Sequence, residues 1–347
     1  MKKNVLLYSH ELKIGGAPSV LCQMGKVLET KYNVVVLSPS DGVMRQQFEQ
    51  NGMEVIVSGE ITDALRALIV EEFEFVVANT ILALPFVMKV CDAIPIYWWI
   101  HESSLAYEGR QDMGEYYQIA AQHAKIFSAG YVAADNFFRF YGIKTKILEF
   151  GLPDSYVSDH ISQTHEAINI ICPSTICELK GQDILVQAIQ KMKNVLRNKC
   201  TFIFLGELRN DNQREYKMIE ELTKKYHNVR LISLLSRDKL LELYYDMDII
   251  VAPSREDATP ATIVEGLMYH KVCICSDGTG ISRYIKDDNN GYVFKNADSD
   301  DLKDKLEYVV DNFNDLGRVR EQGRKIYETI YDYDVFAKKV LEQIGRQ

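Results

Sequence analysis

Two acidic residues, Asp257 and Glu265, flank the start of a predicted helix and lie eight positions apart. The apolar run DMDIIVAP predicts a buried strand, the polar stretch SREDATP a loop, and ATIVEGLMYH a helix. Thr259 is a good N-cap, and Pro260 suits the first helical position because its missing N–H would have no partner there. Helix N-termini attract anions, and ligands of open α/β sheets bind beyond the carboxyl ends of the strands. The segment therefore predicts an anion site beside two carboxylates.

Helical spacing places the second acid. Glu265 lies roughly 9 Å from the helix start at ~1.5 Å per residue, and it shares one helix face with Thr262 and Tyr269. We therefore expect Glu265 to face a cleft rather than the core. Carboxylates around an anion site suit a ligand with both phosphate and hydroxyl groups, as in a nucleotide sugar. The alternative is that both acids only add favourable charge near a helix N-terminus.

The whole segment VAPSREDATPATIVEGLMYHKVCICSDGTGISRYIKDDNNGYVF (251–294) resembles the donor domain of family-4 retaining glycosyltransferases, which have the two-domain GT-B fold. That family has an acid, seven residues, a glutamate, and then a glycine-rich turn and an NG strand. Asp257 takes the first position, where the family usually has glutamate, and Glu265 takes the second, while Glu256 lies one residue out of register. The resemblance implies that the first acid contacts sugar hydroxyls and that the second contacts the ribose.

A cation precedes another predicted helix in the same half of the chain. Lys180 and Gly181 follow the buried strand INIICPS, and a cation there can bind a diphosphate as a point charge. The family commonly carries lysine at this place and an arginine five residues earlier, where this chain has Thr175. Gly206 ends the strand FIFLG, where the backbone can approach a nucleotide.

The first half of the chain offers a glycine pair and a histidine. Gly15 and Gly16 lie where the first strand, NVLLYS, turns into a helix, so the backbone can approach a phosphate or an acceptor there. A purely steric turn is an equally open explanation, and the spacing is not a dinucleotide fingerprint. His101 follows the apolar run IPIYWWI beside Glu102, again at a strand's carboxyl end. In the resembling family this place holds a histidine near the sugar and the acceptor; a structural or surface histidine is the alternative.

Composition limits the partners. The net charge of −9 argues against nucleic acid and gives no general attraction to anionic lipid. Arg139, Lys144 and Lys146 form a mild basic cluster, which is either a solvated face or a weak peripheral membrane contact. No apolar run approaches ~18 residues, and the N-terminus looks like a strand rather than a signal peptide. Seven cysteines, mostly in apolar patterns without zinc-ligand spacing, fit free thiols in a reducing compartment. We therefore expect a cytoplasmic protein, and peripheral contact with the inner membrane face stays open.

Both halves alternate strands and helices around a polar, turn-rich segment at 150–167, which predicts an interdomain linker. The fold class we expect is α/β, with two Rossmann-like doubly wound domains facing across a cleft (GT-B). The first domain, 1–160, would be on the acceptor side, with a C-terminal helix at about 331–347 packing back on it. The second, 166–330, would bind the nucleotide-sugar donor.

The resemblance implies a retaining, metal-independent hexosyltransferase-type enzyme. It would move a sugar from a nucleoside-diphosphate sugar to a glycan or lipid-linked acceptor in polysaccharide assembly, with no cofactor. The candidate catalytic residues are His101, Asp257 and Lys180, and the candidate donor-binding residues are Gly15, Gly16, Gly206, Glu256, Thr259, Thr262 and Glu265. Two alternatives stay open: a non-catalytic GT-B partner subunit, and a nucleotide-sugar epimerase or phosphorylase on the same fold.

Overall fold

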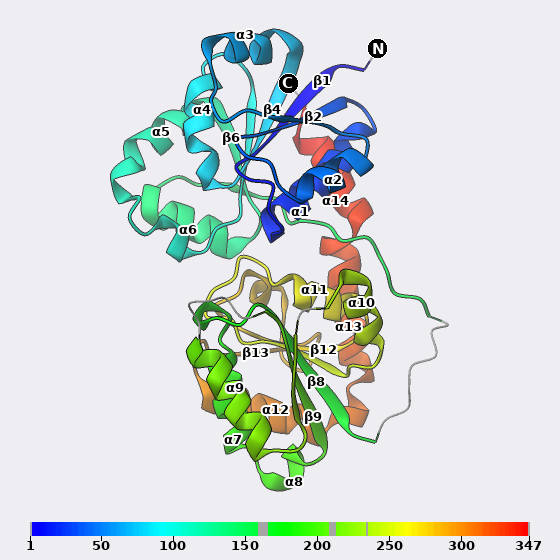
Figure 1. Cartoon of the computed structure of the whole chain (residues 1–347). Coiled ribbons are helices and arrows are strands. Elements are labelled where there is room, and N and C mark those ends of the chain that lie inside the picture. Colours follow the sequence, from blue (N-terminus) through cyan, green and yellow to red (C-terminus); the bar gives the residue numbers. More distant parts are fainter. Residues whose placement is uncertain (1, 159–165, 208–212, 234, 346–347) are drawn as a thin grey trace. The chain divides into compact units, whose positions relative to one another are not determined.

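The computed structural model of the chain describes residues 2–158, 166–207, 213–233 and 235–345, which form two compact α/β units (Figure 1). Unit 1 comprises Met1–Pro153 and Asp332–Gln347, and unit 2 comprises Asp154–Tyr331. The division falls inside the polar segment 150–167. Residues 159–165 of that predicted linker lie outside the described residues.

Unit 1 is built on a parallel sheet, which has seven strands in its described part, in the order β3-β2-β1-β4-β5-β6-β7. The central strands are buried almost throughout because helices cover parallel sheets on both faces, and their sequences are accordingly continuous apolar runs. The strands are β1 (Asn4–Ser9), β2 (Asn33–Ser38), β3 (Glu54–Val57), β4 (Phe73–Asn79), β5 (Ile96–Ile100), β6 (Ala124–Ser128) and β7 (Lys146–Ile147).

The helices of unit 1 include one from the end of the chain. Figure 1 shows α14, in red, beside α1, in blue, and the ring of Phe336 on α14 stacks on Trp99 of β5 with 5.8 Å between centroids. The α-helices are α1 (Gly16–Glu29), α2 (Met44–Gln50), α3 (Asp63–Glu72), α4 (Leu84–Val90), α5 (Gly114–His123), α6 (Tyr131–Tyr141) and α14 (Tyr333–Gln343). Short 3-10 turns are η1 (Ile81–Ala83), η2 (Ser104–Tyr107) and η3 (Gln111–Met113).

Unit 2 repeats the pattern with a parallel sheet whose described strands run β10-β9-β8-β11-β12-β13. Its strands are β8 (Ile168–Pro173), β9 (Cys200–Leu205), β10 (Val229–Ile232), β11 (Ile249–Ala252), β12 (Val272–Ser276) and β13 (Tyr292–Phe294). Its α-helices are α7 (Gln182–Lys191), α8 (Asn194–Arg197), α9 (Gln213–Lys225), α10 (Arg237–Tyr245), α11 (Ala261–Met268), α12 (Ser299–Asp311) and α13 (Gly317–Ile326). Shorter helical turns are η4 (Glu178–Lys180), η5 (Gly280–Tyr284), η6 (Phe313–Asp315) and η7 (Tyr327–Tyr331).

Strand order reverses once in each sheet, between β1 and β4 in unit 1 and between β8 and β11 in unit 2. Ligands of doubly wound sheets bind beyond the carboxyl ends of the strands at such a reversal. His10 and Thr80 follow the two strands in unit 1, and Ser174 and Pro253 follow the two strands in unit 2. Both units are therefore Rossmann-like domains, and each brings loops together at the edge where ligands bind.

Candidate functional site

A pocket of about 210 Å³ opens at the strand reversal of unit 2. The ends of β8 and β11, the turn η4 and the start of α11 form its walls. Three of its lining residues, Lys180, Asp257 and Thr262, are among the candidate residues that the sequence suggested, although they come from segments up to 82 positions apart. The lining residues are Pro173, Ser174, Thr175, Lys180, Val251, Ala252, Ser254, Asp257, Pro260, Ala261 and Thr262.

An ion pair occupies one side of this pocket. Lys180 Nζ donates to Asp257 Oδ2, and the two side chains are 29% and 14% exposed. Gly181 makes the sharp turn behind the lysine with φ +68°, and a Cβ there would lie 2.0 Å from Pro253 O, so only glycine fits. Lys180 thus does not present an unpaired charge to the pocket. It shares its charge with the carboxylate that the sequence predicted to contact sugar hydroxyls.

The predicted role of Thr259 as helix N-cap is wrong. The N-cap residue of α11 is Pro260, and the Thr259 hydroxyl donates to Ala258 O at 2.7 Å instead of accepting from the helix. Asp257 explains the difference, because its Oδ1 accepts the Thr259 N–H at 3.2 Å and so closes a tight local turn before the helix. Pro260, Ala261 and Thr262 line the pocket, so the start of α11 still faces it.

The prediction from helical spacing that Glu265 faces a cleft is wrong. It is 2% exposed, and its carboxylate accepts from Arg237 Nη1 and, at 2.6 Å, from the Tyr244 hydroxyl. Burial, followed by the charge of Glu265, raises the pKa of Tyr244 well above its usual value. Sequence patterns gave no signal for these partners, because Arg237 and Tyr244 lie 28 and 21 positions earlier on α10. Contact between Glu265 and a ribose stays a prediction.

Gly206 and Glu256 also lie outside the lining of the pocket. A Cβ on Gly206 would lie 2.0 Å from Ser174 O, so the glycine allows the loops after β8 and β9 to pack closely. Gln182 holds the first of these loops, because its Nε2 donates to Ser174 Oγ at 2.7 Å and to Thr175 O at 2.9 Å. Glu256 is half-buried in the loop before Asp257. Their contacts with a donor remain predictions.

Unit 1 gathers polar side chains at the ends of β1, β4 and β5. His101 Nε2 lies 2.8 Å from Asn79 Oδ1, and His10 Nδ1 lies 3.0 Å from Thr80 Oγ1. Glu102 turns back to accept the His101 N–H at 2.8 Å and the Ile81 N–H at 3.0 Å. The sequence placed His101 and Glu102 at a strand end but did not single out His10, because its neighbours depend on the strand order of the sheet.

Burial sets the protonation of this cluster. It lowers the pKa of His101 to about 3, with a further contribution from the charge of His10, so the imidazole is neutral at pH 7. It also raises the pKa of Glu102 to about 7, against the opposing effect of the backbone N–H groups that the carboxylate accepts. The cluster therefore combines a neutral imidazole with a carboxyl group that can exchange a proton near neutral pH.

This raised pKa predicts a pH-dependent stability. Because the folded state binds the Glu102 proton more tightly than the unfolded state, the free energy of unfolding falls by up to about 3 kcal/mol as pH rises from about 4.5 to above 7. The lowered pKa of His101 makes the free energy of unfolding rise with pH below pH 6.5. Wild type must therefore be compared with Glu102→Gln, which keeps the contribution of His101 and lacks only that of Glu102. Urea denaturation at pH 5 to 8 measures the difference. The exposed Glu115→Gln is the control, and equal pH slopes in wild type and Glu102→Gln would contradict the prediction.

The local structure does not require the glycine pair at the start of α1, where Gly15 is the N-cap and Gly16 the first helical residue. Gly15 has φ −177°, an extended conformation that any residue adopts, and a Cβ on it would meet only Pro18 at an ordinary 3.6 Å. A Cβ on Gly16 would have no neighbour within 4 Å among the described residues. The explanation by a steric turn therefore has no support in the backbone. Open space beside Gly16 is instead consistent with the approach of a ligand.

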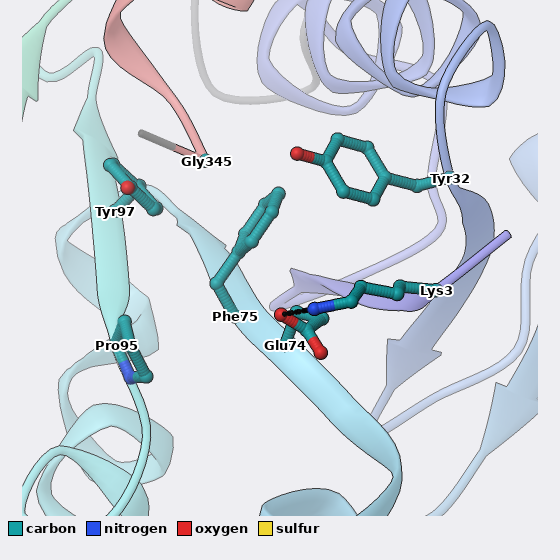
Figure 2. Close-up of a pocket in the computed structure, with 7 residues that line it drawn as sticks. All are labelled: Lys3, Tyr32, Glu74, Phe75, Pro95, Tyr97 and Gly345. Atoms are coloured by element: carbon teal, nitrogen blue, oxygen red, sulfur yellow. Dashed lines mark ion pairs between the residues drawn. The ribbon is translucent and has the colours of Figure 1, made fainter. Parts of the chain in front are cut away.

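Unit 1 has a pocket of its own, of about 250 Å³, which lies away from the polar cluster around His101. Figure 2 shows the rings of Tyr32, Phe75 and Tyr97 around it, with Lys3 directed toward Glu74 at 2.8 Å. Phe75 is near the start of β4, so the pocket is at the amino ends of the strands. Because ligands of open α/β sheets bind at the opposite edge, we assign no part of the candidate site to it.

Three further features concern metals, thiols and membranes. Across the described ranges, no group of three or more His, Cys, Asp or Glu side chains is arranged to hold a metal ion. The seven cysteines are free thiols, of which six are buried. Within the same ranges, no helix combines the length and the hydropathy needed to cross a bilayer.

Known proteins match both halves of the chain. The family described as glycosyl transferases group 1 matches residues 162–326, and the family described as glycosyl-transferase family 4 matches residues 1–125. Glycogen synthase of Thermodesulfovibrio yellowstonii is 26% identical over 165 residues, which are 47% of this chain and 32% of that protein. The chain thus matches about a third of the length of this curated relative.

Solved structures resemble nearly the whole chain. Anabaena Alr3699/HepE, solved in complex with UDP and glucose, has a TM-score of 0.82 and 16% identity, with 99% of each chain covered. WaaG, a glycosyltransferase involved in lipopolysaccharide biosynthesis, has a TM-score of 0.70 and 16% identity, with 99% of this chain and 100% of that one covered. These likenesses show the GT-B fold of two Rossmann-like domains. Together with the two family matches, they place the chain in the family-4 glycosyltransferases with the GT-B fold.

Proposed function

We propose that the chain is a retaining, metal-independent glycosyltransferase that moves a sugar from a nucleoside-diphosphate sugar to a glycan or lipid-linked acceptor. The observation that carries the proposal is the pocket of unit 2, where Lys180 and the start of α11 lie beside the Asp257 carboxylate. Positive groups suit a diphosphate, and a carboxylate suits sugar hydroxyls. The UDP and glucose bound by HepE support a donor of this class.

The proposed transfer breaks the bond between the anomeric carbon and the diphosphate oxygen. A bond from that carbon to the acceptor oxygen forms on the same face, and the leaving phosphate takes the acceptor proton, as the family resemblance implies. Lys180 and the first amides of α11 stabilise the charge that develops on the diphosphate. Because Lys180 is paired with Asp257, it has to turn toward the phosphate or bridge both groups. These groups supply the charge stabilisation that a metal would give, so the proposal needs neither metal nor cofactor.

We assign the acceptor to unit 1, with His101 near its reacting hydroxyl and Gly15 and Gly16 leaving room for it. A role in cell-surface polysaccharide assembly is supported by WaaG, a glycosyltransferase involved in lipopolysaccharide biosynthesis whose fold this chain resembles. The same proposal includes weak peripheral contact with the inner membrane face. Lys144 and Lys146 of the predicted basic cluster line a cavity of about 540 Å³ at the sheet edge, together with Lys125, and would make this contact, whereas Arg139 does not line that cavity.

One set of observations favours a second function, that of a non-catalytic partner subunit. Asp257 neutralises Lys180, and Thr175 lines the pocket where the family commonly carries an arginine. Within the described residues, Lys180 is the one cationic side chain of the pocket lining. Both features would weaken donor binding, and a chain without turnover would keep the fold and bind another protein instead.

Ligand-induced stabilisation distinguishes the two functions. A nucleotide sugar at 100 times its dissociation constant is expected to raise the free energy of unfolding by about 2.7 kcal/mol. We expect one member of a nucleotide-sugar panel, tested without metal, to shift the melting temperature. Glu265→Ala should lose that shift, because in the proposed complex this carboxylate turns from Arg237 to the ribose.

The matched control is Tyr244→Phe, which removes a hydroxyl that bonds Glu265 but leaves the carboxylate in place. Each variant is compared with and without ligand, so any change in its own stability cancels. No shift with any nucleotide sugar would favour the partner subunit. For an active donor, proton NMR of the first product decides whether the anomeric configuration is retained.

A further inference from the structure

Asn79 is the last residue of β4 and is fully buried beside His101. Its amide lies between two partners, the main-chain oxygen of Ala17 at 3.0 Å and the His101 ring at 2.8 Å. Ala17 directly follows the glycine pair in the first turn of α1, so one side chain connects the start of this helix with the candidate histidine. Neither the sequence patterns nor the family resemblance assigned a role to Asn79.

The two partners fix which nitrogen of His101 carries the proton. Ala17 O is a carbonyl oxygen and can only accept, so the Asn79 NH₂ group must face it. The amide oxygen Oδ1 then faces His101 Nε2, and because Oδ1 also can only accept, Nε2 must donate. A neutral imidazole has one N–H, so Nδ1 is left with a lone pair that can accept a hydrogen bond.

The backbone after Asn79 is held in an uncommon conformation that supports this arrangement. Thr80 has φ +73° and ψ 160°, a region that residues other than glycine rarely adopt. Trp98 Nε1 donates to Thr80 O at 2.6 Å, and the Thr80 N–H donates to Trp99 O at 2.8 Å. Thr80 Oγ1 accepts the Leu82 N–H at 3.2 Å and bonds His10. The end of β4 is therefore fixed on both sides of the strand.

We propose that Asn79 is a positioning residue that holds His101 in the Nε2–H tautomer, so that Nδ1 accepts a hydrogen bond from a substrate hydroxyl group. The hydroxyl part of this inference rests on the proposed function, whereas the tautomer follows from the geometry alone. Besides Asn79, the imidazole lies beside the Trp99 ring, with 4.5 Å between ring centroids, and near the charge of His10 from the loop after β1, while the Glu102 carboxyl group accepts the main-chain N–H of His101. With the proton on Nε2, the site selects a hydrogen-bond donor.

NMR of protein labelled with ¹⁵N-histidine tests the tautomer directly. His101→Gln identifies the two ring signals by their loss. In wild type at pH 6 to 8 we expect Nε2 in the range of a protonated nitrogen and Nδ1 in the range of an unprotonated one. Asn79→Leu should let the Nε2 proton exchange rapidly with water, because its acceptor is gone. Asn51→Leu, which removes an amide that donates to Gln47 O, is the control and should leave His101 unchanged.

The proposal is overturned if wild-type His101 carries its proton on Nδ1, or if Asn79→Leu leaves the spectrum as it was. Asn79→Asp keeps an acceptor for the Nε2 proton but adds a negative charge, so His101 should begin to titrate at a higher pH. In transfer assays Asn79→Leu should lower kcat/KM about tenfold, the effect of one lost hydrogen bond. Asn79→Asp should recover activity only above the raised pKa of His101, where the imidazole is neutral again. A lasting loss in both variants at every pH would instead indicate a merely structural role.

The spectra need no substrate, so they separate this inference from the function on which it partly rests. The predicted tautomer in a chain that transfers no sugar would overturn the proposed function and the hydroxyl contact, and would leave the positioning by Asn79 supported. The opposite tautomer in an active enzyme would overturn the positioning role alone.

Discussion

Replacing Lys180 with methionine is expected to lower kcat/KM for sugar transfer by about 10²- to 10³-fold, the usual effect of removing one group that stabilises developing charge. Methionine keeps the length and apolar stem of lysine but has no charge to offer the departing diphosphate. Among the residues that the structure describes, Lys180 is the one cationic side chain in the pocket lining, so no other described lining residue can replace its charge. The measurement is steady-state transfer with the donor that the thermal-shift panel identifies.

Two further variants make this result specific. Lys180→Arg keeps the charge and should recover part of the activity. Lys191→Met removes another ion-paired lysine of unit 2, whose Nζ lies 2.7 Å from Asp300 Oδ2 and which does not line the pocket. Lys191→Met should remain within about twofold of wild type, as expected for a surface pair. If Lys180→Met also stayed that close to wild type, Lys180 would have no part in transfer.

The sequence was sufficient to predict the two parallel sheets and which candidate residues follow the carboxyl ends of their strands. Apolar runs that end in polar residues marked β8, β11 and β5, and alternation with helices required parallel pairing. Strand ends converge at a reversal of strand order, which is why Lys180 and Asp257 meet although they lie 77 positions apart. That convergence follows from topology, so a pattern that recognises strands is enough to predict it.

Contacts between neighbouring helices and loops could not be predicted in the same way. Helical spacing put Glu265 on a polar face, but α10 covers that face with Arg237 and Tyr244, and no local pattern records which helix packs there. The predicted N-cap of α11 is wrong because the side chain of Asp257, two residues before Thr259, forms a competing turn. The roles of His10 and Asn79 likewise depend on which strands are neighbours in the sheet.

The second large effect is on stability: Arg255→Ala is expected to lower the free energy of unfolding of unit 2 by about 3 kcal/mol. Both terminal nitrogens of the guanidinium donate to Asp183, Nη1 to Oδ1 at 2.8 Å and Nη2 to Oδ2 at 2.7 Å, and this contact raises the pKa of Arg255 above its usual range. The Asp183 side chain is only 3% exposed, so removal of the arginine leaves a buried carboxylate without its cation. Arg255 is partly exposed, and the N-terminus of α7 also stabilises the Asp183 carboxylate. We therefore expect a loss at the lower end of the range for broken buried ion pairs.

Hydrogen exchange during urea denaturation is the suitable measurement, because it reports each unit separately while both tryptophans lie in unit 1. Arg45→Ala is the matched control: it removes two ion pairs of similar length, 2.9 Å to Asp41 and 2.8 Å to Glu49, on an exposed surface, and should cost much less than Arg255→Ala. Equal losses in the two variants would show that burial of Asp183 contributes nothing.

Arg255 also donates to Glu178 O beside Lys180. Loss of this contact should loosen the loop that carries Asp257, so Arg255→Ala should bind the donor less tightly even at urea concentrations below the denaturation range.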